Sequence, residues 1–185
     1  MDKVMDKVMG KFGGRAPMPP RPSVAKVLAA FTGGTIGIGA LALLTSQYNA
    51  HLLMAPFGAS CVLLFATPDV PLAQPRNVIG GHFFASLIGL IAAHYLPVIG
   101  PLELGVAVGL AIALMQVTRT LHAPAGADPL VIMLMGKAVP WTFLLTPVLA
   151  GSVILVLIAL IVNNVERNSK WPKYWHGHKW PWSQA

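Results

Sequence analysis

The sequence predicts an all-α membrane protein with four long transmembrane helices, two short Pro-led helices and an inverted 3+3 internal repeat. Of its 185 residues, 55% are hydrophobic and only 10% are charged, which is far from the balance of a soluble domain. Four apolar segments approach or reach the roughly twenty residues that cross the hydrocarbon core of a bilayer. Two shorter apolar segments share the motif A-P-x-G-A, which suggests the repeat.

Positive charge is concentrated at the two ends of the chain. Of the 13 lysines and arginines, only Arg76, Arg119 and Lys137 lie between the first and last apolar segments. By the positive-inside rule, both termini are expected in the cytoplasm, with an even number of crossings. We therefore predict an integral protein of the bacterial inner (plasma) membrane with no nucleic-acid partner. The lone Cys61 excludes an internal disulfide and a cysteine-rich metal site.

The charge pattern divides the chain into three predicted parts. Residues 1–23 form a basic, Pro-rich cytoplasmic arm, residues 24–165 the transmembrane domain, and residues 166–185 a basic, Trp-rich tail. The arm lacks the continuous apolar core of a signal peptide. The tail mixes tryptophans with lysines and histidines, a composition typical of the headgroup region, so we expect it to contact membrane lipids.

The four long helices are predicted over residues 24–47, 78–97, 102–117 and 141–162. Glu103 lies in the first turn of the third helix, where a carboxylate can cap the helix and is favoured by its dipole. Glycines at 33 and 37, and again at 105 and 109, are expected to let helices approach closely. Such faces are compatible with a homo-oligomer.

The two short segments, residues 55–66 and 123–136, each open with A-P-x-G-A and each follow a long helix. The chain therefore consists of two predicted copies of one unit: a long helix, a short Pro-led helix and a long helix. If the short helices cross the membrane, there are six crossings and the second copy is inverted relative to the first. If they are re-entrant, there are four crossings, and the terminal charges agree with both arrangements.

The Pro-led helix starts are predicted to bind a small anion. Proline suits the first turn because the amide it lacks has no intrahelical partner there, and the following N–H groups and the helix dipole favour negative charge. Inverted broken helices can bring two such ends together near the membrane midplane. The candidate substrate-binding residues are Pro56, Gly58, Ala59, Ser60, Arg76, Asn77, Arg119, His122, Pro124, Gly126, Asp128 and Lys137.

A purely structural interpretation remains open for several of these residues. The motif glycines could simply allow tight packing, and the motif prolines could begin helices at the water interface. Asp128 could be an N-cap, with Pro129 at the first helical position. His82 and His94 are interpreted as interfacial or hydrogen-bonded helix histidines. With no P-loop, G-x-S-x-G, H-E-x-x-H or dinucleotide fingerprint, we expect no enzyme, catalytic residue, metal or cofactor.

Two stretches carry a family resemblance: "APFGASCVLLFATPDVPLAQPRNVIGGHFFASLIG" and "LHAPAGADPLV". They resemble the HPP family of integral membrane proteins, and the similarity spans about residues 24–165. The family is named for a His-Pro-Pro motif before A-G-A-[DN]-P. Here His122 and Pro124 are retained, whereas Ala123 replaces the first proline.

HPP proteins are generally described with four transmembrane segments and a transport role, and plastid and cyanobacterial members are associated with nitrite. The resemblance therefore implies a transporter or channel for a small inorganic anion, with nitrite leading. Arg119, His122 and Lys137 would attract the anion, and a histidine could couple proton movement to it. The alternative is a non-transporting membrane module that binds lipid or a partner protein through its arm and tail.

Overall fold

The structure is a computed structural model that describes residues 5, 10, 17–48, 51–136, 139–165 and 170–175. Within these residues the chain forms six α-helices, joined by short 3₁₀ and π segments, and no strand. Three helical segments are long and apolar enough to cross a membrane: Val24–Tyr48, Pro75–Tyr95 and Trp141–Val162. The count of four long helices is not confirmed, because the remaining candidate, Pro101–Val117, has 17 residues.

The first half of the chain contains α2 (Val24–Tyr48), α3 (Ala55–Cys61) and α4 (Pro75–Tyr95). Helix α3 has its proline in the first turn, as predicted, and continues into a π-helical turn over Val62–Ala66. The first short apolar segment is therefore helical over the whole predicted range, although only its first part is a regular α-helix.

The second half begins with α5 (Pro101–Val117), whose first turn is capped as predicted. The Glu103 Oε2 accepts a hydrogen bond from the Gly100 N–H at 3.0 Å. The second short segment follows as a 3₁₀ turn, η3 (Ala123–Ala127), and α6 (Asp128–Met135). Both short segments are thus helical close to their predicted bounds.

The last helical segment, Trp141–Val162, is irregular before it becomes α7 (Ala150–Val162). Thr146 leaves the helical region, with φ −139° and ψ 115°. The reason is local, since Pro147 has no N–H to donate and its ring restricts the residue before it. The predicted long helical segment over residues 141–162 is confirmed, but it contains a break at Thr146 that the prediction did not include.

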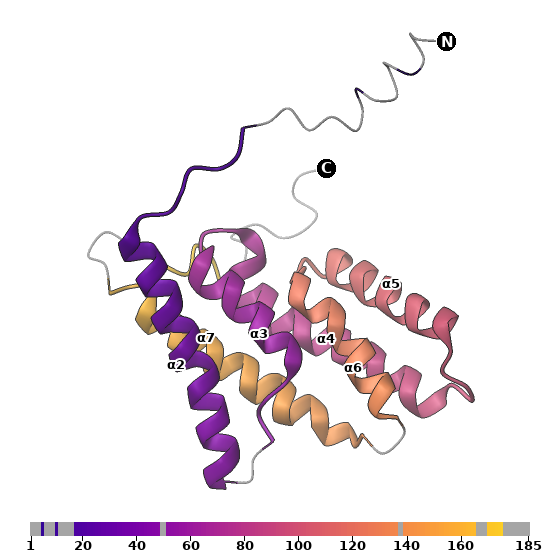
Figure 1. The fold of residues 1–185 in the computed structure, drawn as a ribbon. Coiled ribbons are helices and arrows are strands. Elements are labelled where there is room, and N and C mark those ends of the chain that lie inside the picture. Colours follow the sequence, from indigo (N-terminus) through magenta and orange to yellow (C-terminus); the bar gives the residue numbers. More distant parts are fainter. Residues whose placement is uncertain are drawn as a thin grey trace.

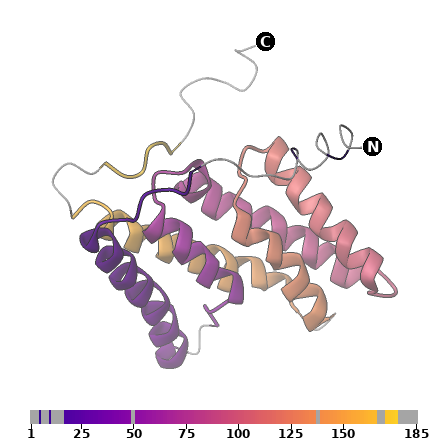
Figure 2. The ribbon, with the colours of Figure 1, turned by 45° about the horizontal axis from the view of Figure 1, so that its top comes forward.

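The successive apolar segments run in alternating directions (Figures 1 and 2). The start of α2 and the end of α7 therefore lie at one end of the molecule, and the turn between α4 and α5 lies at the other. Helix α4 packs against α5, α6 and η3, and His82 of α4 contacts α3 directly. Helix α2 packs on α3 and α7. The alternation is compatible with two opposed halves, but the inverted repeat itself stays a prediction.

Close helix packing depends on glycine in only one of the two predicted places. A Cβ added at Gly37 would lie 3.2 Å from side-chain atoms of both Leu155 and Phe65, and one at Gly33 would overlap the Phe65 ring, so α2 is closely packed at both glycines. At Gly105 and Gly109 of α5 a Cβ would meet nothing within 4 Å. The prediction of close approach is therefore confirmed for α2 and wrong for these positions of α5.

Candidate functional site

Five polar side chains form a cluster in the centre of the molecule: Ser60 on α3, His82 and Ser86 on α4, His122 just before η3, and Asp128 at the start of α6. Each of them is 0% exposed. Both short Pro-led segments and the long helix α4 therefore contribute to one buried site, which we call the polar cluster.

Ser60 lies between two imidazoles. Its Oγ is 2.8 Å from His82 Nε2 and 2.9 Å from His122 Nε2. On the other side of its ring, His122 Nδ1 is 2.7 Å from the carbonyl oxygen of Leu72, in the loop before α4. Hydrogen-bonded atoms thus connect that loop to the middle of α4.

The chain of contacts continues from His82 to Asp128. His82 Nδ1 is 2.8 Å from Asp128 Oδ2, and the Ser86 hydroxyl donates to the same oxygen at 3.0 Å. The other carboxylate oxygen, Oδ1, has no hydrogen-bond partner in the part of the chain that the structure describes. The N-cap interpretation of Asp128 is wrong, because Ala127 occupies the cap position and makes no side-chain capping bond.

Ser60 and Asp128 occupy the same place in the two short segments, directly after A-P-x-G-A. They contact opposite nitrogens of the His82 ring. A single residue of α4 therefore links the two motifs. The predicted meeting of the two Pro-led segments is visible in these contacts.

A pocket of about 640 Å³ opens between the same two segments. It is lined by Ala55, Pro56, Ala59, Val62, Leu63, Ala123, Pro124, Ala127 and Val131. The lining is apolar, but three members of the polar cluster each directly follow or precede a lining alanine in the sequence. The pocket and the cluster are therefore formed by neighbouring residues of the same two segments.

The motif glycines do not serve tight packing within one chain. A Cβ added at Gly58 or Gly126 would meet nothing within 4 Å, and Gly58 is exposed. The packing interpretation of these glycines is therefore wrong for contacts inside the chain. Pro56 and Pro124 both line the pocket and both stand in the first turn of their segments.

The basic candidates lie at the ends of helices instead. Arg76 donates to the carbonyl of Thr118 at 2.9 Å and to that of Arg119 at 3.3 Å. Asn77 donates to the carbonyl of Leu121 at 2.9 Å. Arg76 and Asn77 thus hold the short loop that leads into His122. Arg119 itself is exposed, with a left-handed φ of 56°, and Lys137 lies outside the described residues.

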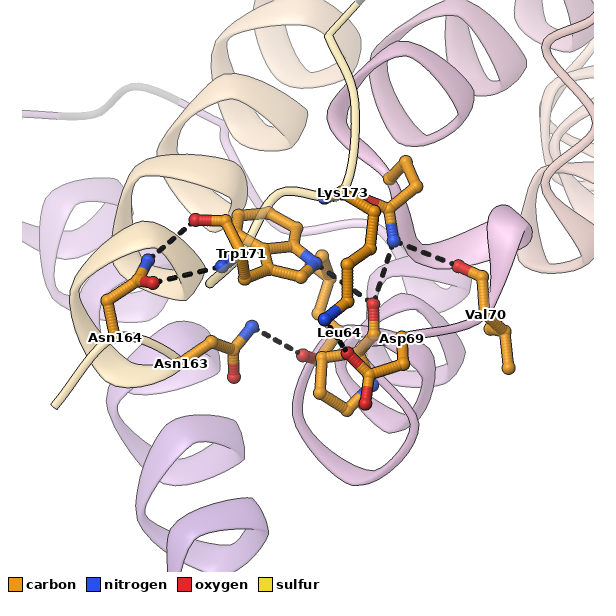
Figure 3. Close-up of polar contacts among 9 residues, drawn as sticks. Leu64, Asp69, Val70, Asn163, Asn164, Trp171 and Lys173 are labelled. Carbon is orange, nitrogen blue, oxygen red and sulfur yellow. Dashed lines mark hydrogen bonds and ion pairs between the residues drawn. The ribbon is translucent and has the colours of Figure 1, made fainter. Parts of the chain in front are cut away.

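The start of the tail packs on the loop at this end of the molecule (Figure 3). Trp171 is 4% exposed, and its Nε1 donates to the Pro68 carbonyl at 3.0 Å. Its backbone exchanges two hydrogen bonds with the Asn164 side chain, and Lys173 pairs with Asp69 at 2.9 Å. Residues 170–175 therefore support the loop whose Leu72 carbonyl accepts a hydrogen bond from His122 of the polar cluster.

Ser60, His82 and Asp128 follow the order of nucleophile, base and orienting acid in serine hydrolases. Two features distinguish them from such a triad. The Ser60 side chain is completely buried, and its Oγ also contacts His122. In the described residues, no group of three or more His, Cys, Asp or Glu side chains is arranged to hold a metal ion.

Sequence reasoning did not include His82 or Ser86 among the candidate site residues, although it interpreted His82 as an interfacial or hydrogen-bonded helix histidine. They are four residues apart and so share one face of α4, which is a pattern the sequence does show. Two polar residues at this spacing on an apolar helix can mark a face turned toward other polar groups. Their partners could not be identified in advance, because Ser60 and Asp128 lie 22 and 46 residues from His82.

Comparison with known proteins identifies the family. The family described as "HPP, transmembrane region" matches residues 19–172, most of the chain. This chain belongs to the HPP family. It is also 38% identical over 176 residues to a transmembrane protein of Dictyostelium discoideum, and 36% identical over 175 residues to a second one. No solved structure matches this HPP protein.

The alignments cover 88% and 89% of this HPP protein but only 60% and 56% of the two Dictyostelium proteins. The names of these relatives state that they are transmembrane proteins. With the apolar helices, the family establishes this HPP protein as a membrane protein.

The family motif lies in the polar cluster. His122 is the buried histidine that contacts Ser60 and the Leu72 carbonyl. Ala123, which replaces the first proline of the motif, lines the pocket. The 3₁₀ turn forms with Pro124 alone in its first turn, so the second proline of the motif is sufficient for the local fold.

Proposed function

We propose that this HPP protein transports a small monovalent inorganic anion, with nitrite as the leading substrate. The observation that supports this most is the meeting of two short Pro-led segments at a pocket with a buried His–Ser–His–Asp cluster behind it. Discontinuous helices that meet in this way are the usual place of the binding site in secondary transporters.

The burial of the cluster favours a functional role over a structural one. Ionisable side chains inside a membrane protein are costly, and well-packed apolar residues can stabilise a fold as well or better. Here two histidines and an aspartate are 0% exposed in the core. A role in binding a solute or carrying a proton explains why these three side chains are present in the core.

The pocket suits a small solute. Its walls are formed mostly by alanine, proline and valine, and the donors behind them are imidazole N–H and serine O–H groups. Arg76 and Arg119 at one end of the helices would raise the local concentration of an anion. The choice of nitrite follows the resemblance to plastid and cyanobacterial HPP proteins.

Nitrite uptake into vesicles tests the proposal. The full-length chain is reconstituted, and entry is compared with that into protein-free vesicles. We expect faster entry for the wild type and a large loss for His122→Ala. His94→Ala is the matched control, because His94 bonds within its own helix, to the Leu90 carbonyl. Wild-type uptake no faster than that of empty vesicles would show that the proposal is wrong.

A further inference from the structure

We propose that the polar cluster binds one proton beyond those of an ionised carboxylate and two neutral imidazoles, and that this proton moves together with the anion. The inference rests on the proposed function and names its coupling ion. It follows from counting the protons that the observed contacts need.

The contact with Leu72 fixes the protonation of one ring nitrogen of His122, Nδ1. This nitrogen lies 2.7 Å from the Leu72 carbonyl oxygen, and a carbonyl oxygen can only accept a hydrogen bond. Nδ1 therefore carries a proton. In a neutral imidazole the second nitrogen, Nε2, is then an acceptor, and it faces the Ser60 hydroxyl.

Three contacts remain along the cluster, and each needs one proton between its two atoms. They join His122 Nε2 to Ser60 Oγ at 2.9 Å, Ser60 Oγ to His82 Nε2 at 2.8 Å, and His82 Nδ1 to Asp128 Oδ2 at 2.8 Å. The Ser60 hydroxyl is also 3.3 Å from the Pro56 carbonyl oxygen in its own helix, but its contacts with the imidazoles are shorter, so its proton is counted there. An ionised aspartate and neutral histidines supply only this hydroxyl proton and one N–H of His82. One contact would then have two lone pairs facing each other, with no solvent to separate them.

A single extra proton satisfies all three contacts. It can reside on Asp128 as a carboxylic acid, on His82 as an imidazolium, or on His122 as an imidazolium. To pass from Asp128 to His122, the carboxyl proton moves to His82 Nδ1, the His82 Nε2 proton to Ser60 Oγ, and the Ser60 hydroxyl proton to His122 Nε2. Three bonds to hydrogen break and three form, so one proton moves in net terms.

The extra proton also makes the cluster electrically neutral. The ion pairs among the described residues are His82 with Asp128 and Lys173 with Asp69, so no lysine or arginine there compensates Asp128. A buried, uncompensated carboxylate at membrane depth is strongly disfavoured. The proton is the positive charge that this site has available.

Among the residues that the structure describes, the surroundings of His82 contribute no other titratable group to the cluster. Helix α3 presents Ser60 and the ring of Phe57, whose centroid is 5.0 Å from that of His82. The second short segment presents His122 and Asp128. On α5, Glu103 is engaged by the Gly100 N–H, and α7 presents the hydroxyl of Ser152, bonded to its own helix.

The charge of the polar cluster couples the movement of the proton to that of the anion. With the proton bound, the cluster is neutral and does not repel an anion in the adjoining pocket. Without it, the Asp128 carboxylate repels the anion. The anion therefore binds only to the protonated cluster, and the two cross together. One-to-one symport carries no net charge, so the membrane potential does not oppose it.

Initial rates of nitrite entry into vesicles, corrected for protein-free vesicles, test the coupling. An inside-alkaline gradient of about one pH unit corresponds to about a tenfold proton ratio and should drive accumulation toward that ratio. An imposed potassium diffusion potential should leave the rate unchanged. Nitrite entry that follows the potential and ignores the pH gradient would overturn the proton inference and leave the transport proposal standing.

Asp128→Asn tests the assignment to the cluster, because the amide N–H takes the place of the carboxyl proton permanently. The ratio of rates with and without the pH gradient should fall to about one, whatever the absolute rate. Asp69→Asn, which removes an exposed carboxylate paired with Lys173, should keep the wild-type ratio.

A direct proton count does not depend on a transport measurement. Infrared and ¹⁵N-histidine spectra of the wild-type chain at neutral pH should show one buried carboxylic acid or one buried imidazolium. The signal is assigned by its loss in Asp128→Asn or His82→Gln. An ionised Asp128 together with two neutral imidazoles would overturn the inference. If nitrite flux is absent but the extra proton is found, the transport proposal and the coupling to nitrite fail, and the protonation of the cluster stands.

Discussion

His82 shows how one residue can depend on distant parts of the chain. The sequence interpretation of His82 as a hydrogen-bonded helix histidine is confirmed, but its partners lie on other segments. The expectation that Ser60, His122 and Asp128 belong to one site was available from the A-P-x-G-A motifs. The role of His82 was not, because it comes from the packing of α4 against both short segments.

The hydroxyl of Ser60 should matter more than its small size suggests. Ser60→Ala leaves the Nε2 atoms of His82 and His122 without their shared partner in a buried site. We expect a loss of about 1–3 kcal/mol in the free energy of unfolding. Thermal unfolding in detergent measures it. Ser46→Ala, where an exposed hydroxyl bonds to its own helix, should have little effect, and equal losses would contradict the prediction.

At the scale of elements, the short helices were predictable and their packing was not. Proline in the first turn and a continuous apolar run are local features, and both short segments begin at their predicted residues. The break at Thr146 had the same kind of local signal in Pro147, which the prediction overlooked. Which glycines touch a neighbour depends on helix orientation, and so Gly105 and Gly37 could not be told apart from the sequence.

Helix α4 should tolerate no side chain at Gly89. A Cβ there would lie 2.8 Å from the Pro129 Cα, a backbone atom at the start of α6 that cannot move aside alone. Gly89→Ala should cost about 1–3 kcal/mol of unfolding free energy through overpacking. In Gly105→Ala the added methyl meets nothing within 4 Å and should be neutral. Equal melting temperatures for the two variants would contradict the prediction.

The tail and the domain are expected to be coupled through Trp171. Trp171→Ala removes a ring that is 4% exposed and its bond to the Pro68 carbonyl, so we expect a loss of about 3–5 kcal/mol. Trp175→Ala, at a site 48% exposed, should change stability little. Limited proteolysis after residue 165 measures the release of the tail. Equal cleavage of the two variants would mean that Trp171 does not hold it.

At the scale of the whole molecule, the pocket opens on the face formed by α3 and α6. Ala55, Gly58, Ala59 and Ala123 are exposed on this face. Small residues on an exposed face of a membrane helix allow close contact with another helix. A second copy of the chain on this face would separate the pocket from lipid. This separation is needed because an anion path must be shielded from lipid.

This arrangement predicts a homo-oligomer that depends on α3. Gly58→Trp adds a bulky ring at a position where nothing lies within 4 Å, so the fold should survive while the contact between copies is blocked. Light scattering in detergent should show a lower mass than for the wild type. Gly105→Trp, on the open side of α5, should keep the wild-type mass. The prediction is wrong if the wild type is already a monomer.

The sequence by itself determined the helical membrane class, the extent of both short segments and the family, because these depend on local apolar runs, prolines and motifs. Only the tertiary structure decided that Ser60 and Asp128 contact opposite sides of His82, and that His122 closes the chain at the Leu72 carbonyl. Hydrogen bonds between residues far apart in the chain exist only once the helices are packed, and the proton count of the site is a property of those bonds.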